Sequence, residues 1–154
     1  MPNYGKTFEQ KFLKDWTCSF PGTFILRLYD TTNGYKSISN PCDFIAFNNN
    51  RLFLLEIKSH AGASIPFDAI PQYSQLILYS QMPQVRAGIV LWLYDKDLCL
   101  YVPVHTIKEL MDEGEKSVGV RHMESHDMIV LPSVKKRVYL DTDYTPLASL
   151  KEGW

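Results

Sequence analysis

The chain has 154 residues, of which 45% are hydrophobic and 21% are charged, a composition ordinary for a globular protein. The composition excludes a low-complexity chain, and every apolar run is too short to span a bilayer. The formal net charge of −1 excludes an overall basic signature, so contact with nucleic acid would need a local basic surface. Charges near the N-terminus argue against a signal peptide, and the widely separated Cys18, Cys42 and Cys99 favour free thiols in the cytosol.

The first third of the chain predicts one helix and three strands. Aromatic residues at helical spacing indicate the helix, and alternating apolar residues indicate the first strand, which follows the break at Pro21-Gly22. Asp30–Asn40 is expected to be a turn or hairpin connection. The polar run Asn48-Asn49-Asn50 predicts an antiparallel hairpin of the next two strands. The expected elements are Thr7–Trp16, Thr23–Tyr29, Cys42–Phe47 and Arg51–Lys58.

The rest of the chain follows a loop with Gly62 and Pro66 and alternates between helical and extended patterns. A helix is expected from about Pro71 to Gln81, since proline is favoured in a first turn. Ala87–Tyr94 is so continuously apolar that it predicts a strand buried on both faces. The remaining expectations are strands at Leu98–Val104 and Met128–Leu131, a helix at Thr106–Asp112 and an extended segment at Lys136–Leu140. Residues 1–154 are therefore expected to form one mixed α/β domain, with a helix on each face of a central sheet.

Two carboxylates and an ammonium group are expected to converge at one edge of this sheet. Glu56 and Lys58 are two residues apart on a strand, so their side chains point to the same face. The hairpin would bring Asp43, at the start of the preceding strand, beside them. The alternative is that Asp43 merely begins a strand and that Glu56 and Lys58 form a solvated pair.

These residue types together suit phosphodiester hydrolysis. Carboxylate oxygens are ligands for Mg²⁺ or Mn²⁺, and such a metal acidifies its bound water and polarises a phosphate. A lysine beside that water can orient it and stabilise developing negative charge.

The spacing Pro41-x-Asp43 with Glu56-x-Lys58 resembles the motif of the PD-(D/E)xK nuclease superfamily. More particularly, the chain is similar to RecU-type Holliday junction resolvases, including short phage-borne versions, from about Gly5 to Lys136. The shared segments include Gly5-Lys6-Thr7-Phe8-Glu9, Ser64-Ile65-Pro66 and Lys116-Ser117-Val118. The resemblance implies a restriction-endonuclease-like mixed β-sheet flanked by helices. It also implies a homodimer that uses Mg²⁺ to cut paired strands of a four-way DNA junction.

Two further site residues follow from the resemblance. It places Glu9 of the first helix near the metal, where the alternative is a solvated charge at the border of the buried face. It also places a glutamine of the later helix toward the site. Gln75 is favoured over Gln72, because its neighbours Leu78 and Tyr79 are expected to belong to the apolar face.

One departure from the family leaves the substrate open. RecU-type resolvases carry a long stalk before the catalytic aspartate, whereas Asp30–Cys42 leaves room for a short hairpin at most. A restriction-like or repair endonuclease acting on duplex DNA is therefore an alternative. A DNA-binding recombination factor without cleavage activity is another.

Basic residues supply candidate contacts to the DNA backbone. A solvated surface is the alternative for most of them, a structural ion pair for Arg27 and a loop tip for Lys36. The candidates are Arg27, Lys36, Lys116, Arg121, Lys135, Lys136 and Arg137.

Overall fold

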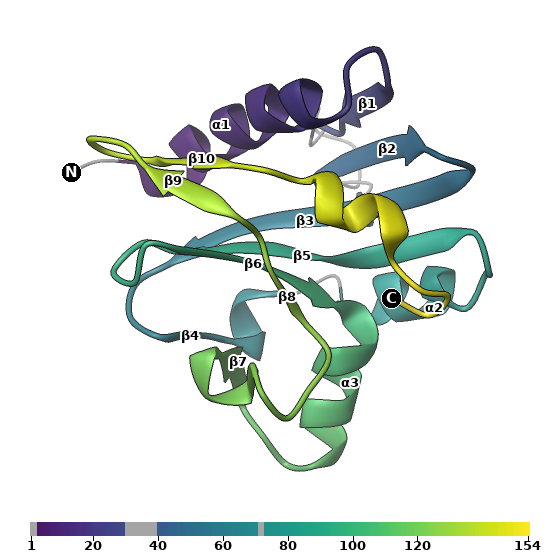
Figure 1. Ribbon diagram of the computed structural model, residues 1–154. Coiled ribbons are helices and arrows are strands. Elements are labelled where there is room, and N and C mark those ends of the chain that lie inside the picture. The colour runs from purple at the N-terminus through teal and green to yellow at the C-terminus, as the bar shows by residue number, and fades with distance from the viewer. Residues whose placement is uncertain (1–2, 30–39, 71–72) are drawn as a thin grey trace, which may run out of the picture.

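A six-stranded mixed β-sheet forms the centre of the computed structural model, which describes residues 3–29, 40–70 and 73–154 (Figure 1). Neighbouring strands are antiparallel except for the third and fourth in the sheet, which run parallel. In spatial order the strands are β1 (Phe24–Arg27), β2 (Phe44–Asn48), β3 (Arg51–His60), β5 (Val85–Leu93), β6 (Leu98–Pro103) and β8 (Ile129–Val130).

The hairpin of β2 and β3 carries the residues expected to be catalytic, and its predicted antiparallel pairing is confirmed. Asn48 lies opposite Arg51, so Asn49 and Asn50 form a two-residue turn with φ angles of 52° and 60°. Such a turn needs positive φ at both central residues, and asparagine tolerates this conformation better than most residues. The turn therefore fixes the register along the whole hairpin.

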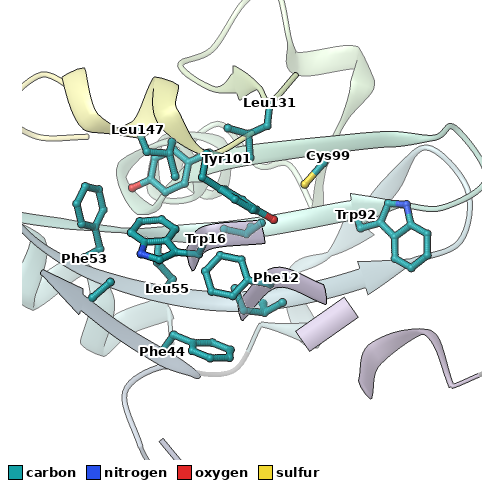
Figure 2. Packing of buried hydrophobic residues seen from close by; sticks show 14 of the residues in the cluster. Phe12, Trp16, Phe44, Phe53, Leu55, Trp92, Cys99, Tyr101, Leu131 and Leu147 are labelled. Atoms are coloured by element: carbon teal, nitrogen blue, oxygen red, sulfur yellow. The ribbon is translucent and has the colours of Figure 1, made fainter. Parts of the chain in front are cut away.

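Three helices cover the two faces of the sheet, as the sequence predicts (Figure 1). Helix α1 (Tyr4–Ser19) lies on one face, and α2 (Tyr73–Ser80) and α3 (Val104–Asp112) lie on the other. Figure 2 shows Phe12 and Trp16 of α1 packed on the sheet, with ring centroids 4.9 Å from Phe44 and 5.4 Å from Phe53 respectively. This aromatic layer fixes α1 against the hairpin and so determines where Glu9 lies.

The parallel pair β3–β5 lies at the centre of the sheet. Every residue of β5 is buried, which confirms the strand predicted from its continuous apolar run. Its alternate side chains enter different clusters, with Val90 and Trp92 facing α1 and Ile89 and Leu91 facing α3.

Two short sheets were not expected from the sequence. Strand β4 (Ser64–Pro66), in the segment predicted as a loop, pairs with β7 (Ser117–Gly119). Strands β9 (Ser133–Lys135) and β10 (Leu140–Thr142) pair with each other. The extended segment predicted at Lys136–Leu140 is wrong, because its first four residues connect these two strands. Three-residue strands carry too little alternation to be recognised from sequence.

Among the described residues there are also three short 3-10 helices, at Phe67–Ala69, Val120–His122 and Thr145–Ser149. Within the described ranges, no helix has the length and apolar character needed to cross a membrane. Cys18, Cys42 and Cys99 are free thiols, as predicted. The cytosolic location stays a prediction.

Candidate active site

Asp43 is fixed to the backbone of β3 on both sides of Glu56. Its N–H donates to the carbonyl of Leu55 (3.1 Å), and its carboxylate oxygen Oδ2 accepts the N–H of Ile57 (2.8 Å). Leu55 also faces Phe44 in the strand register, so it faces two successive residues, as in a β-bulge. A bulge re-aims side chains, and here the Asp43 carboxylate is held beside Glu56.

Lys58 completes a compact group with the two carboxylates. Its Nζ atom lies 3.5 Å from Oε1 of Glu56, and both residues project from the same face of β3. The Glu56 side chain is 4% exposed, whereas that of Lys58 is 28% exposed. The structure thus brings Asp43, Glu56 and Lys58 together, with the lysine on the more accessible side.

The charge of Glu56 is strongly disfavoured in this position. Burial, followed by repulsion from Asp43, raises the pKa of Glu56 to about 8, and attraction to Lys58 offsets only part of this shift. Near neutral pH the carboxyl group therefore carries a proton unless a cation takes its place. A cation bound beside Glu56 would relieve the repulsion from Asp43.

Glu9 and Arg27 extend the site toward α1. The Nη2 atom of Arg27 lies 3.0 Å from Oε2 of Glu9, and its Nη1 atom lies 3.3 Å from Oδ1 of Asp43. The pKa of Glu9 is raised by burial and then by repulsion from Asp43, with Arg27 acting in the opposite direction. Arg27 thus forms a structural ion pair, the alternative considered for it, and it does so within the site.

The donor set of Asp43 and Glu56 fits a hard divalent cation. Both residues supply carboxylate oxygens, and their mutual repulsion is relieved when a cation binds between them. In the part of the chain that the structure describes, no cluster of three or more His, Cys, Asp or Glu is arranged to hold a metal ion. The carboxylate of Glu9 does not add a third ligand to Asp43 and Glu56 in this arrangement, because it is paired with Arg27.

Gln75 does not have the surroundings that were expected. Leu76 is the residue that α2 buries, while Leu78 and Tyr79 are 61% and 40% exposed. The assignment of Leu78 and Tyr79 to the apolar face is therefore wrong. Gln75 itself is exposed and has no hydrogen bond to the site among the described contacts, and Gln72 lies outside the described residues.

The basic residues predicted to contact DNA do not form one surface. Lys116 and Arg121 flank β7 on the face of α2 and α3, whereas Lys135, Lys136 and Arg137 lie beside β10 on the face of α1. Several carry surface ion pairs, which are Arg121–Glu115, Lys135–Asp97 and Lys136–Asp141. Lys36 lies outside the described residues. Their contact with DNA stays a prediction.

A groove next to Glu9 and Arg27 was not anticipated from the sequence. It has a volume of about 270 Å³, and Lys6, Gln10 and Tyr29 contribute to its lining. Lys6, Glu9, Gln10 and Leu13 all line it from α1 and follow the i, i+3, i+4, i+7 spacing of one helix face. That spacing places the four side chains on one face of α1, but the groove also needs Arg27, Tyr29 and Phe44, which only the tertiary structure brings beside this face.

The sheet order and its covering helices define a restriction-endonuclease-like mixed α/β fold. A solved structure with this fold is that of Hjc from Archaeoglobus fulgidus, a Holliday junction resolvase from an archaeal hyperthermophile. The likeness has a TM-score of 0.54 at 18% sequence identity and covers 94% of this chain and 100% of that chain. No family model matches the sequence, and no curated protein is significantly similar to it. At this identity the likeness establishes the fold alone.

Proposed function

We propose that the chain is a metal-dependent endonuclease that cuts branched DNA, with the four-way junction as its principal substrate. The observation that carries this proposal is the arrangement of Asp43 around Glu56, with Lys58 Nζ 3.5 Å from the glutamate. Two carboxylates held together in a largely buried position repel each other, and a bound cation would relieve that repulsion. The partly accessible ammonium group of Lys58 beside them can contact an anionic phosphate.

Each residue of this group has a distinct role in the proposed reaction. Asp43 and Glu56 would hold Mg²⁺ or Mn²⁺, which when bound acidifies water and neutralises phosphate charge. Lys58 orients the attacking water and stabilises the negative charge that develops on the phosphate oxygens. Glu9 and Gln75 are proposed to support the cluster, as the family resemblance implies.

The choice of branched DNA is supported by fold likeness to a resolvase and by the resemblance to RecU-type enzymes. Cutting both strands symmetrically requires two sites, which a homodimer would supply. Phe24 and Phe47 lie opposite each other on β1 and β2, and with Leu26 they expose apolar surface at the edge of the sheet. An exposed apolar surface of this kind is consistent with self-association.

Cleavage of labelled DNA tests the proposal. The purified chain should cut a four-way junction in the presence of Mg²⁺, with paired nicks in opposing strands. Lys58→Ala and Asp43→Asn should each lower the rate by at least about a hundredfold, since each removes a group that stabilises the transition state. Lys108→Ala is the matched control, because Lys108 is exposed and pairs only with Asp112 among the described contacts. Equal cleavage by parent and Lys58→Ala proteins would contradict the proposal.

A nuclease acting on linear duplex DNA is the second candidate, and a short connection favours it. Strand β1 ends at Arg27 and β2 begins at Phe44, which leaves too little chain for a long stalk. Equal cleavage of linear duplex and junction would favour this restriction-like or repair activity. Binding of junction DNA without cleavage would instead favour a non-catalytic recombination factor.

A further inference from the structure

Arg27 contacts two of the three carboxylates expected to bind metal. Its guanidinium donates to Oε2 of Glu9 (3.0 Å) and to Oδ1 of Asp43 (3.3 Å). The contact to Asp43 Oδ1 is made by the Nη1 atom of Arg27. This atom also lies within hydrogen-bond distance of the carbonyl oxygens of Asp43 (3.1 Å) and Leu28 (2.7 Å). In the metal-free protein the guanidinium therefore offsets the negative charges of Glu9 and Asp43.

The two carboxylate oxygens of Asp43 are not equivalent. Oδ2 accepts the backbone N–H of Ile57 at 2.8 Å, a contact that the strand pairing holds in place. Oδ1 receives only the longer side-chain contact from Arg27 among the described hydrogen bonds. A charge-assisted hydrogen bond of full strength measures about 2.7–2.9 Å, so the 3.3 Å contact is a weak one. Oδ1 is therefore the Asp43 oxygen available to an incoming cation.

A divalent cation and the Arg27 guanidinium compete for this oxygen. Even with all three carboxylates ionised, Glu9, Asp43 and Glu56 supply three negative charges, whereas Arg27 and Lys58 supply two positive ones. A metal ion added without movement would give the half-buried cluster a net positive charge and place two cations side by side. Displacing Arg27 removes that repulsion.

The neighbouring groove offers Arg27 a second position. The residue already lines this cavity of about 270 Å³, and its guanidinium lies 5.4 Å from the centre of the Tyr29 ring. A rotation toward Lys6 and Gln10 would keep contact with the ring while leaving Asp43. From the groove, its planar donors could bind a phosphate of the substrate.

We propose that Arg27 is a displaceable counter-cation, which holds Glu9 and Asp43 in the metal-free protein and moves into the groove when a divalent metal binds. This inference rests on the proposed function, since it requires the carboxylates to bind metal. On this proposal Arg27 opposes metal binding, so its removal should strengthen the affinity for the metal. A purely structural role predicts the opposite, because removal of Arg27 would then weaken the site.

Calorimetric titration of the whole chain with MgCl₂ tests this inference. Arg27→Gln should bind Mg²⁺ about tenfold more tightly than the parent, because it removes a competing charge within a few ångströms. Arg27→Lys, which keeps the charge but is too short to bridge both carboxylates, should give an intermediate affinity. Lys108→Gln is the control, because Lys108 lies on α3, is exposed and pairs only with Asp112 among the described contacts, and its affinity should equal that of the parent.

The outcomes separate this inference from the proposed function. If the parent binds Mg²⁺ and Asp43→Asn abolishes binding, the metal site stands. An unchanged or weaker affinity in both Arg27 variants, with melting temperatures near that of the parent, would then overturn the role of Arg27 alone. Absence of Mg²⁺ binding in every protein would overturn both proposals. Should Arg27→Gln fail to fold, Arg27→Lys decides the question by the same comparison.

Discussion

Glu56 is buried beside Asp43, and its ionisation is therefore tied to the stability of the protein. In the unfolded chain its pKa is close to the usual value of 4.5, whereas burial and repulsion from Asp43 raise it to about 8 in the folded state. The folded protein then binds more protons than the unfolded chain between these two values.

The melting temperature of the metal-free protein should fall as the pH rises from about 4.5 to about 8. The stabilising contribution of the protonated glutamate is complete below the lower value and is lost as Glu56 ionises in the folded state. A loss of about 1 kcal/mol lowers the melting temperature of a domain of this size by about 2–4 °C. Thermal melts in chelator-treated buffers measure the profile.

Glu56→Gln supplies the control for this pH dependence. The amide cannot ionise, so the slope between these pH values should flatten. Mg²⁺ added at pH 9 should stabilise the parent more than Glu56→Gln, because the metal takes the place of the lost proton. An equal slope in the two proteins would show that Glu56 is not the group responsible.

The β4–β7 pair shows how an element depends on a contact distant in sequence. Gly119 lies in extended backbone directly against β4, and a Cβ atom at this position would lie 2.1 Å from the carbonyl oxygen of Ala63. It would also lie 2.6 Å from Cα of Ser64. Both neighbours are backbone atoms, so they cannot move aside as the end of a flexible side chain can.

Gly119→Ala should therefore destabilise the protein by about 1–3 kcal/mol, as overpacking of buried positions does. Chemical denaturation measures the change in the free energy of unfolding. Gly5→Ala is the control, because its Cβ would meet only Asn3 Oδ1, at an ordinary 3.7 Å. In helix α1 this substitution should be neutral or stabilise by up to about 1 kcal/mol. Equal stabilities of the two variants would contradict the close approach.

At the scale of the whole molecule, the N-terminal helix and the C-terminal hairpin are joined by a buried charge. Asp15 of α1 is 7% exposed, and its Oδ2 accepts the N–H of Thr142 in β10 at 3.0 Å. Lys11 forms ion pairs with both Asp15 and Asp141. These contacts pack β10 against α1, the helix that carries Glu9, and so help to fix the position of Glu9 in the site.

Asp15→Ala should lower the free energy of unfolding by about 1–3 kcal/mol, because it leaves the buried N–H of Thr142 without its acceptor. Urea denaturation measures this loss. Asp112→Ala removes the exposed partner of Lys108 and should change stability by less than about 1 kcal/mol. Similar losses in the two variants would show that burial at Asp15 does not matter.

Local patterns were sufficient for much of the fold. The apolar run of β5, the asparagine turn of the hairpin and the helical spacing in α1 each depend on neighbours in sequence, and each was predicted correctly. The β4–β7 and β9–β10 pairs were missed, because three-residue strands owe their pairing to distant segments. Gln75 was chosen on a helix face that tertiary packing turned outward.

The sequence by itself determined that Glu56 and Lys58 share a face and that a hairpin returns toward Asp43, since strand alternation and turn chemistry are local. Only the tertiary structure decided how Asp43 is held, because the bulge at Leu55 and the N–H of Ile57 belong to the paired strand. It also decided that Arg27 bridges Glu9 and Asp43. That contact joins β1, α1 and the start of β2, and it forms only when the aromatic layer of α1 packs on the sheet.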